Sequence, residues 1–350
     1  MNTTNIPRIA LMLIPLLSIV NNNTKGQSRS RGGLDSAINH TAAMFMSDPA
    51  RVTLSIGIYD HGNLFTYHFG KKEVPDDESV YEIGSITKTM TGILLANAVR
   101  EKKVMLDDDI RKYMDGQYPN LEYEGQPIRL SQLLNHTSGL PFSLPASPVP
   151  GQTYTKEQFY QDLHLVKLDT VPGYKLSYSN SAAQLLGYIL ERVYRKTYDQ
   201  LLAEYITTPL RMSNTGINIS RHLLKGHNNE GEIMPYTESG AAGGVRSTLP
   251  DMLQYIRYEM DESNPVVALS HQPTWGEIQN YAIGLNWQML QKAGKQKSIF
   301  QNGGTSGFSS NLVFYPDLKT GIVLLTNEAD KTAQDKLSEV AEQIFAQLNK

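Results

Sequence analysis

Alternating hydrophobic and polar positions near both ends of the chain predict β-strands. Residues 53–59 alternate in this way, a turn-forming segment follows at 60–63, and residues 64–70 supply a second arm. Near the C-terminus, residues 312–315 and 321–326 form a similar pair around a proline-containing turn. The pattern therefore predicts strand pairs at the two ends of the chain.

Apolar residues at helical spacing predict four long helices. They occupy residues 34–46, about 85–102, the segment that begins after Asn180, and about 331–348. The intervening stretch, residues 107–212, is also rich in helical pattern and contains loops with many proline and glycine residues. Helices therefore dominate the middle of the chain.

These elements predict an α+β fold. We expect an antiparallel sheet flanked by N- and C-terminal helices, in an α/β sheet domain formed by residues 28–80 and 240–350. Residues 81–239 are expected to form an inserted, mainly α-helical domain. Strand signals at both ends, with a helical block between them, favour a sheet that both ends of the chain complete.

An apolar run at residues 9–20 follows Arg8 and precedes a polar stretch at 21–31. The run is shorter than the roughly 20 residues of a membrane-spanning helix, but it has the length of a signal-peptide core, about 7–15 residues. We expect residues 1–27 to be a signal peptide and polar leader, and the protein to be exported, periplasmic or secreted, with no strong membrane anchor. An apolar start on a cytosolic protein is the alternative.

The composition narrows the chemistry. Thirty-two Lys and Arg residues against thirty-five Asp and Glu residues give a formal net charge of -3 over 350 residues, so no overall positive field exists for nucleic acid. The absence of cysteine excludes disulfides, thiolate zinc sites and a cysteine nucleophile. The histidines show no metal-ligand spacing. We therefore expect no metal, no cofactor, and an oxygen or amine nucleophile.

The strongest chemical signal is Ser85-Ile86-Thr87-Lys88 at a predicted helix start. A serine in a first helical turn lies near free backbone N–H groups, and a lysine three residues later lies on the same helix face. A partly desolvated amine in that position can activate the hydroxyl. The alternative is structural, with Ser85 as a helix N-cap and Lys88 as a solvated helix residue.

A second signal is Tyr178-Ser179-Asn180, directly before a predicted helix. A tyrosine near a lysine ammonium is expected to have a lowered phenol pKa and to relay a proton, while an asparagine amide can donate to a substrate carbonyl. The alternative is again structural, with Ser179 or Asn180 capping the helix and Tyr178 packing against it.

A third signal is the glycine-rich segment 301–308, which leads into the C-terminal strands. Small residues let a strand edge approach a ligand closely, and a main-chain N–H there can face a developing oxyanion. A glycine-rich turn is the alternative. Among the other polar residues, His136 is expected to be a hydrogen-bonded scaffold residue and Glu82 a scaffold residue near the site.

Taken together, Ser85-x-x-Lys88, Tyr178-x-Asn180 and the segment 301–308 resemble the motifs of the penicillin-recognising serine hydrolases. The resemblance is to the class C beta-lactamase and D-alanyl-D-alanine carboxypeptidase group, including its esterases. It extends over about residues 34–348. Further similar segments lie at residues 133–141, 209–212, 243–248 and 283–287.

The resemblance implies a role for each motif residue. Ser85 becomes the nucleophile, Lys88 its activating partner and Tyr178 the general base and acid. Asn180 becomes a substrate-binding donor, with the active site at the interface of the two domains. The backbone N–H groups of Ser85 and Gly304 would form the oxyanion hole. The remaining implied substrate-binding residues are Gln301, Gly303, Gly304 and Thr305.

Gln301 departs from the family pattern, which usually has lysine or histidine at this position. A neutral amide cannot supply the charge that binds a substrate carboxylate. The resemblance implies an acyl-enzyme serine hydrolase acting on beta-lactams or D-amino-acid cell-wall peptides, that is, on a small-molecule or peptidoglycan-derived substrate. An esterase of the same fold for small or D-alanyl esters, and a non-catalytic penicillin-binding or sensing protein, are the alternatives. We expect a monomer.

Overall fold

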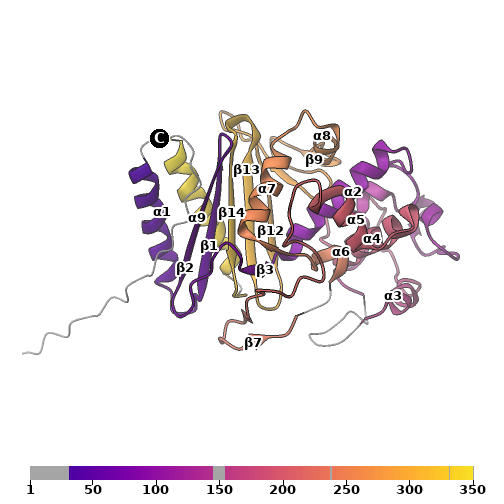
Figure 1. The fold of residues 1–350 in the computed structure, drawn as a ribbon. Coiled ribbons are helices and arrows are strands. Elements are labelled where there is room, and N and C mark those ends of the chain that lie inside the picture. Colours follow the sequence, from indigo (N-terminus) through magenta and orange to yellow (C-terminus); the bar gives the residue numbers. More distant parts are fainter. Residues whose placement is uncertain (1–30, 145–153, 237–238, 331, 350) are drawn as a thin grey trace, which may run out of the picture.

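One eight-stranded antiparallel sheet organises the fold (Figure 1). The structure is a computed structural model that describes residues 31–144, 154–236, 239–330 and 332–349, so the expected leader, residues 1–27, lies outside the described residues. The strand order is β2-β1-β14-β13-β12-β11-β10-β9. The strands are β1 (Thr53–Asp60), β2 (Asn63–Gly70), β9 (Trp275–Glu277), β10 (Tyr281–Ile283), β11 (Gln288–Leu290), β12 (Ser298–Gly304), β13 (Ser309–Tyr315) and β14 (Thr320–Thr326).

The first hairpin forms one edge of this sheet and pairs there with the last strand. In the hairpin, Thr53 pairs with Gly70 and Asp60 pairs with Asn63, as the alternating pattern predicts. The other edge of β1 pairs with β14, where Ser55 lies opposite Leu325. Both ends of the chain therefore complete one sheet, which confirms the predicted α+β fold with an antiparallel sheet.

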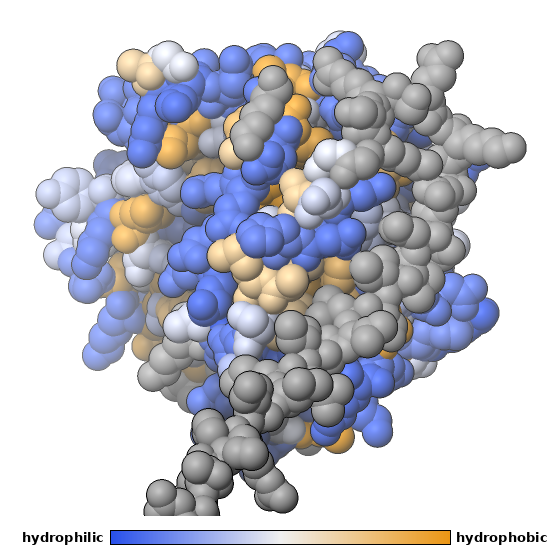
Figure 2. All heavy atoms as spheres, turned by 90° about the vertical axis from the view of Figure 1, so that its left-hand side faces the viewer, coloured by the Kyte–Doolittle hydropathy of each residue, from blue (hydrophilic) through white to orange (hydrophobic). Residues whose placement is uncertain are grey.

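Helices cover both faces of the sheet (Figure 1). The flanking helices α1 (Arg31–Met46) and α9 (Ala333–Leu348) lie side by side on one face and bury Ile38 and Leu337 against the strand residues Ile56 and Leu324. Figure 2 looks onto this side of the molecule, where hydrophilic side chains predominate among scattered apolar ones. The outer helices thus close the core on this side.

The opposite face carries the helices that hold the site. Helix α7 (Leu249–Glu259) packs on β1 and β14, and α8 (Pro265–Ser270) packs on α2 (Thr87–Arg100). Beyond α2 lie α3 (Lys156–Leu163), α4 (Asn180–Tyr194), α5 (Tyr198–Leu202) and the short α6 (Gly240–Gly243), with α4 and α6 both packed on α2 (Figure 1). Because 11 of the 14 residues of α2 are buried, this helix forms the centre of the larger hydrophobic core.

Short elements complete the chain. Three two-stranded sheets join β3 (Val80–Glu82) to β8 (Arg246–Thr248), β4 (Glu122–Tyr123) to β5 (Gln126–Pro127), and β6 (Gly226–His227) to β7 (Ile233–Met234). The 3-10 turns are η1 (Gly84–Ile86), η2 (Ile110–Tyr113), η3 (Leu130–Leu133) and η5 (Pro316–Leu318), and η4 (Ala203–Thr207) is a π-helical turn. Among the described residues, we find no helix with the length and apolarity that crossing a membrane requires.

A buried ion pair joins the start of the sheet to the segment before α9. The guanidinium of Arg51, which is 1% exposed, lies 2.9 Å from a carboxylate oxygen of Glu328 and also contacts Asp330. Burial raises the pKa of Glu328 to about 7, although Arg51 opposes this shift. The carboxylate therefore depends on the guanidinium to remain charged inside the protein.

We predict that Arg51→Met lowers the free energy of unfolding by about 3–5 kcal/mol, because it leaves Glu328 buried without its partner. Urea denaturation monitored by circular dichroism measures the change. The double variant Arg51→Met/Glu328→Gln is the control and should recover part of the loss. A single variant as stable as the wild type would show that the pair contributes nothing.

Candidate active site

Ser85 lies in the 3-10 turn η1, immediately before α2, and not in the first α-helical turn as the spacing predicted. The turn places the serine beside the end of strand β12. Gly84 has φ +53, and a Cβ built on it would lie 2.5 Å from the backbone nitrogen of Gly304. Only glycine permits this conformation and this approach together, so the backbone N–H of Gly304 lies next to the serine turn.

Lys88 lies at the centre of the site, with its side chain fully buried. Its Nζ donates to Ser85 Oγ at 3.0 Å, to Asn180 Oδ1 at 2.7 Å and to the carbonyl oxygen of Ala242 at 2.5 Å. Burial lowers the pKa of Lys88 to about 7. The interpretation of Lys88 as a solvated helix residue is therefore wrong, and a neutral amine beside Ser85 is accessible near neutral pH.

Tyr178 contacts the serine from the other side. Its hydroxyl donates to Ser85 Oγ at 2.7 Å, and its ring centroid is 4.8 Å from Lys88 Nζ. The sequence predicted a lowered phenol pKa, and this prediction is wrong, because burial raises the pKa of Tyr178 to about 12. The amine that was expected to supply positive charge is itself desolvated, so the phenol keeps its proton and acts as a donor to Ser85.

Asn180 begins helix α4, and the residue before it caps that helix. Ser179 Oγ accepts the backbone N–H of Ala182 at 3.0 Å, which confirms the capping alternative for Ser179 alone. Asn180 Oδ1 accepts from Lys88, and this bond orients the amide so that its Nδ2 can donate to a ligand. The helix cap and the site therefore use different side chains of the same motif.

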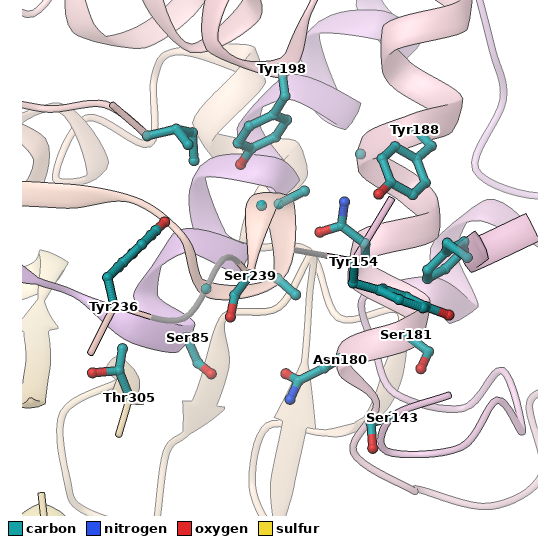
Figure 3. A pocket seen from close by; sticks show the side chains of 18 of the residues that line it. Ser85, Ser143, Tyr154, Asn180, Ser181, Tyr188, Tyr198, Tyr236, Ser239 and Thr305 are labelled. Carbon is teal, nitrogen blue, oxygen red and sulfur yellow. The ribbon is translucent and has the colours of Figure 1, made fainter. Parts of the chain in front are cut away.

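A cavity of about 710 Å³ opens at Ser85 (Figure 3). Ser85 and Thr305 line its end near the sheet, while Asn180 lines it from α4. Several aromatic side chains that the sequence motifs do not mark also line it. They are Phe142, Tyr154, Phe159, Tyr188, Tyr198 and Tyr236.

The spacing on α4 carries a signal that the motif analysis missed. Asn180, Gln184, Tyr188 and Glu191 recur every three or four residues and therefore share one helix face, which lines the cavity. The charged side chains in the lining, Glu191 and Asp199, are both acidic. Lys156 reaches this wall as the partner of Glu191, with its Nζ 2.8 Å from the carboxylate.

Gln301 and Gly303 lie on β12 behind the cavity wall. Gln301 is 3% exposed, accepts from Gln288 Nε2 at 3.0 Å and donates to the carbonyl oxygen of Asn302 at 2.8 Å. A Cβ on Gly303 would lie 2.1 Å from the carbonyl oxygen of Ile83. Unlike Gly304 and Thr305, neither residue lines the cavity, and the Gln301 amide already has partners within the sheet.

A serine, a histidine and an aspartate also form a hydrogen-bonded chain elsewhere. Ser55 Oγ lies 2.8 Å from His68 Nδ1, and His68 Nε2 lies 2.9 Å from Asp77 Oδ1. Ser55 is fully buried and also bonds Tyr81. No substrate carbonyl can reach the buried Ser55, so this hydrogen-bonded set is structural. Ser85, by contrast, lines a cavity.

The described residues contain no group of three or more histidine or acidic side chains suited to a metal ion. A hydroxyl has a basic amine on one side and a phenolic proton donor on the other, and a backbone N–H lies nearby. This arrangement fits acyl transfer through a serine.

Comparisons with known proteins agree with this chemistry. The family model named Beta-lactamase matches residues 38–345. A D-alanyl-D-alanine-carboxypeptidase/endopeptidase, AmpH, of Escherichia coli (strain K12) is 28% identical over 306 residues, covering 80% of this chain and 79% of that protein. A beta-lactamase of Yersinia enterocolitica is 23% identical over 343 residues, covering 83% of this chain and 86% of that protein.

Among solved structures, a beta-lactamase/D-alanine carboxypeptidase from Yersinia pestis, complexed with citrate, superimposes with a TM-score of 0.79. It is 25% identical, and the match covers 92% of this chain and 100% of that chain. The fold and these matches define a serine hydrolase. The chain belongs to the beta-lactamase family, as its sequence motifs predicted.

We predict that kcat/KM for a neutral ester rises with pH through about 7. Lys88 must lose its proton before it can accept one from Ser85, so the rate should fall about tenfold per pH unit below its pKa of about 7. Initial rates between pH 5 and 9 measure the profile. A rate that does not change between pH 5 and 8 would exclude Lys88 as the base.

We also predict that Gly84→Ala lowers the acylation rate by about 10²–10³-fold, because its Cβ would displace the N–H of Gly304, which the sequence resemblance implies is an oxyanion-hole donor. Gly62→Ala is the matched control. Gly62 also has a positive φ, +91, but a Cβ there meets nothing within 4 Å. The control should retain full activity, and equal losses in the two variants would point to backbone strain alone.

Proposed function

We propose that this protein is an acyl-enzyme serine hydrolase acting on beta-lactams or D-amino-acid cell-wall peptides, like the relatives named above. The observation that carries the proposal is the hydrogen-bonded set at Ser85. Its Oγ lies 3.0 Å from a buried lysine amine and 2.7 Å from a tyrosine hydroxyl, at the end of a cavity. A purely structural role requires none of these contacts.

In the proposed reaction, Ser85 Oγ attacks the substrate carbonyl carbon while its proton passes to neutral Lys88 Nζ. The backbone N–H groups of Ser85 and Gly304 stabilise the oxyanion, and the Asn180 amide donates to the substrate. When the carbonyl re-forms, the bond to the leaving group breaks and Tyr178 protonates that group, regaining a proton from Lys88. Water then attacks the ester with the same groups and releases the acid and free Ser85.

An esterase acting on small or D-alanyl esters is the second candidate. Two observations favour it. Gln301 replaces the expected cation and bonds Gln288, and the cavity lining contains the acidic residue Asp199 besides Glu191, which is paired with Lys156. Both features disfavour a substrate with a free carboxylate and suit an uncharged ester.

A non-catalytic penicillin-binding or sensing protein is the third candidate, and the intact contacts among Ser85, Lys88 and Tyr178 argue against it.

We further propose that residues 28–80 and 240–350 form one domain and residues 81–239 the other, with Ser85 at their interface. The proposal includes export to the periplasm or outside the cell, a monomeric enzyme, and a substrate that is a small molecule or a peptidoglycan fragment.

We predict that the purified protein hydrolyses at least one of three substrates: a chromogenic cephalosporin, a nitrophenyl ester and a D-alanyl-D-alanine peptide. Ser85→Ala is the control and should lose at least about 10³-fold in kcat/KM. Turnover of the cephalosporin identifies a beta-lactamase, and turnover of the ester alone identifies an esterase. Activity that persists in the Ser85→Ala variant would contradict the proposed nucleophile.

The Gln301→Lys variant tests whether a cation at position 301 favours a substrate that carries a carboxylate. We expect it to raise kcat/KM for the cephalosporin, which carries a carboxylate, relative to kcat/KM for the neutral ester by about tenfold, since a charged hydrogen bond contributes about 1.5–3 kcal/mol. Gln301→Met, which is similar in size and uncharged, is the control. An unchanged ratio in Gln301→Lys would show that this position does not select for the carboxylate.

A further inference from the structure

Tyr178 lies in a segment without regular secondary structure, between Gly173 and the start of α4. Neither a helix nor a strand fixes its ring, yet the proposed reaction needs its hydroxyl 2.7 Å from Ser85 Oγ. The residue is 36% exposed, so packing alone holds it weakly. Other contacts must hold this segment in place.

The carbonyl oxygens of Pro141 and Phe142 accept hydrogen bonds from Ser179 and Asn180, and further contacts around Tyr178 come from His136. Its carbonyl oxygen accepts the backbone N–H of Ser177 at 2.7 Å, and its Nδ1 accepts the backbone N–H of Ser179 at 3.4 Å. Its imidazole lies against the Tyr178 ring, with the ring centroids 4.2 Å apart. His136 therefore contacts three consecutive residues, with Tyr178 in the middle.

His136 is itself held firmly and without charge. It is 5% exposed, and burial together with the nearby charge of Lys88 lowers its pKa to about 3. The ring is thus neutral, and Nδ1, which accepts a bond from Ser179, carries no proton. Its φ is +61, a conformation that asparagine tolerates better than other residues with a side chain.

We propose that His136 is a positioning residue that aligns the Tyr178 hydroxyl with Ser85 without touching the substrate. This inference rests on the proposed serine hydrolase function and extends it to a residue outside the three motifs. The neutral imidazole supports the aromatic ring without adding a second positive charge beside Lys88.

The test is a double-mutant cycle between His136 and Tyr178. It measures acylation by the ester or cephalosporin that the wild type hydrolyses fastest. His136→Ala removes both the ring and the acceptor, and we expect kcat to fall about 10–100-fold with KM changed less than threefold. His136→Asn keeps an acceptor near the position of Nδ1 and suits the positive φ, so it should restore part of the rate. In a Tyr178→Phe background, His136→Ala should cost less than about threefold, because its effect passes through the lost hydroxyl.

His164 offers a matched control. Its ring also stacks on a tyrosine, Tyr118, with the centroids 4.2 Å apart, but it lies outside the site. His164→Ala should leave kcat unchanged. An equal loss from His136→Ala in the wild-type and Tyr178→Phe backgrounds would overturn the proposal and indicate a general role in folding.

A second measurement does not depend on turnover. Ionisation of the Tyr178 phenol is followed by ultraviolet absorbance as the pH rises. Subtracting the titration of the matched Tyr178→Phe variant isolates the signal of this one tyrosine. In His136→Ala the phenol pKa should fall from about 12 toward the ordinary value of 10, because the released ring becomes solvated. An unchanged titration would overturn the positioning role. If the wild type hydrolyses no substrate, the proposed function fails, and this titration still decides the role of His136.

Discussion

The burial of one amine is the constraint on which the site depends. Lys88 Nζ has acceptors from three separate parts of the chain: the serine turn η1, the start of α4 and the short helix α6. Placing a lysine in a protein interior is costly unless its protons are satisfied, so these three segments must be in place together. The same burial lowers the lysine pKa to about 7 and thereby gives the amine its chemical use.

The sheet supplies the other half of the site through close backbone approach. Strand β12 ends at Gly304, next to the serine turn, and Ser310 Oγ on the neighbouring strand donates to the carbonyl oxygen of Ile83. At Gly84 and Gly303 any side chain would collide with the opposing backbone. The distance between sheet and serine is thus set by main chain against main chain, which is stiffer than a contact between side chains.

Burial also decides which polar groups perform chemistry. Ser55, His68 and Asp77 have the composition of a catalytic triad, but the serine and the histidine are buried within the first hairpin. Ser85 has no histidine partner, yet it lies at a cavity whose lining is aromatic and acidic. Access and surroundings, more than the identity of the side chains, separate a reactive serine from a structural one.

The sequence by itself determined the hairpin at residues 53–70, the C-terminal strand pair, the flanking helices and the set Ser85, Lys88, Tyr178 and Asn180. Those features follow from local periodicity and from motifs whose members are fixed by their chemistry. Only the tertiary structure decided the rest. It placed Ser85 in a 3-10 turn and gave the Gln301 amide a hydrogen bond from Gln288 on the neighbouring strand. It also brought the His136 ring against Tyr178 and raised the phenol pKa of Tyr178, which the motif predicted to be lowered. Each of these depends on burial by segments distant in the chain, because desolvation and close packing arise only when such segments meet.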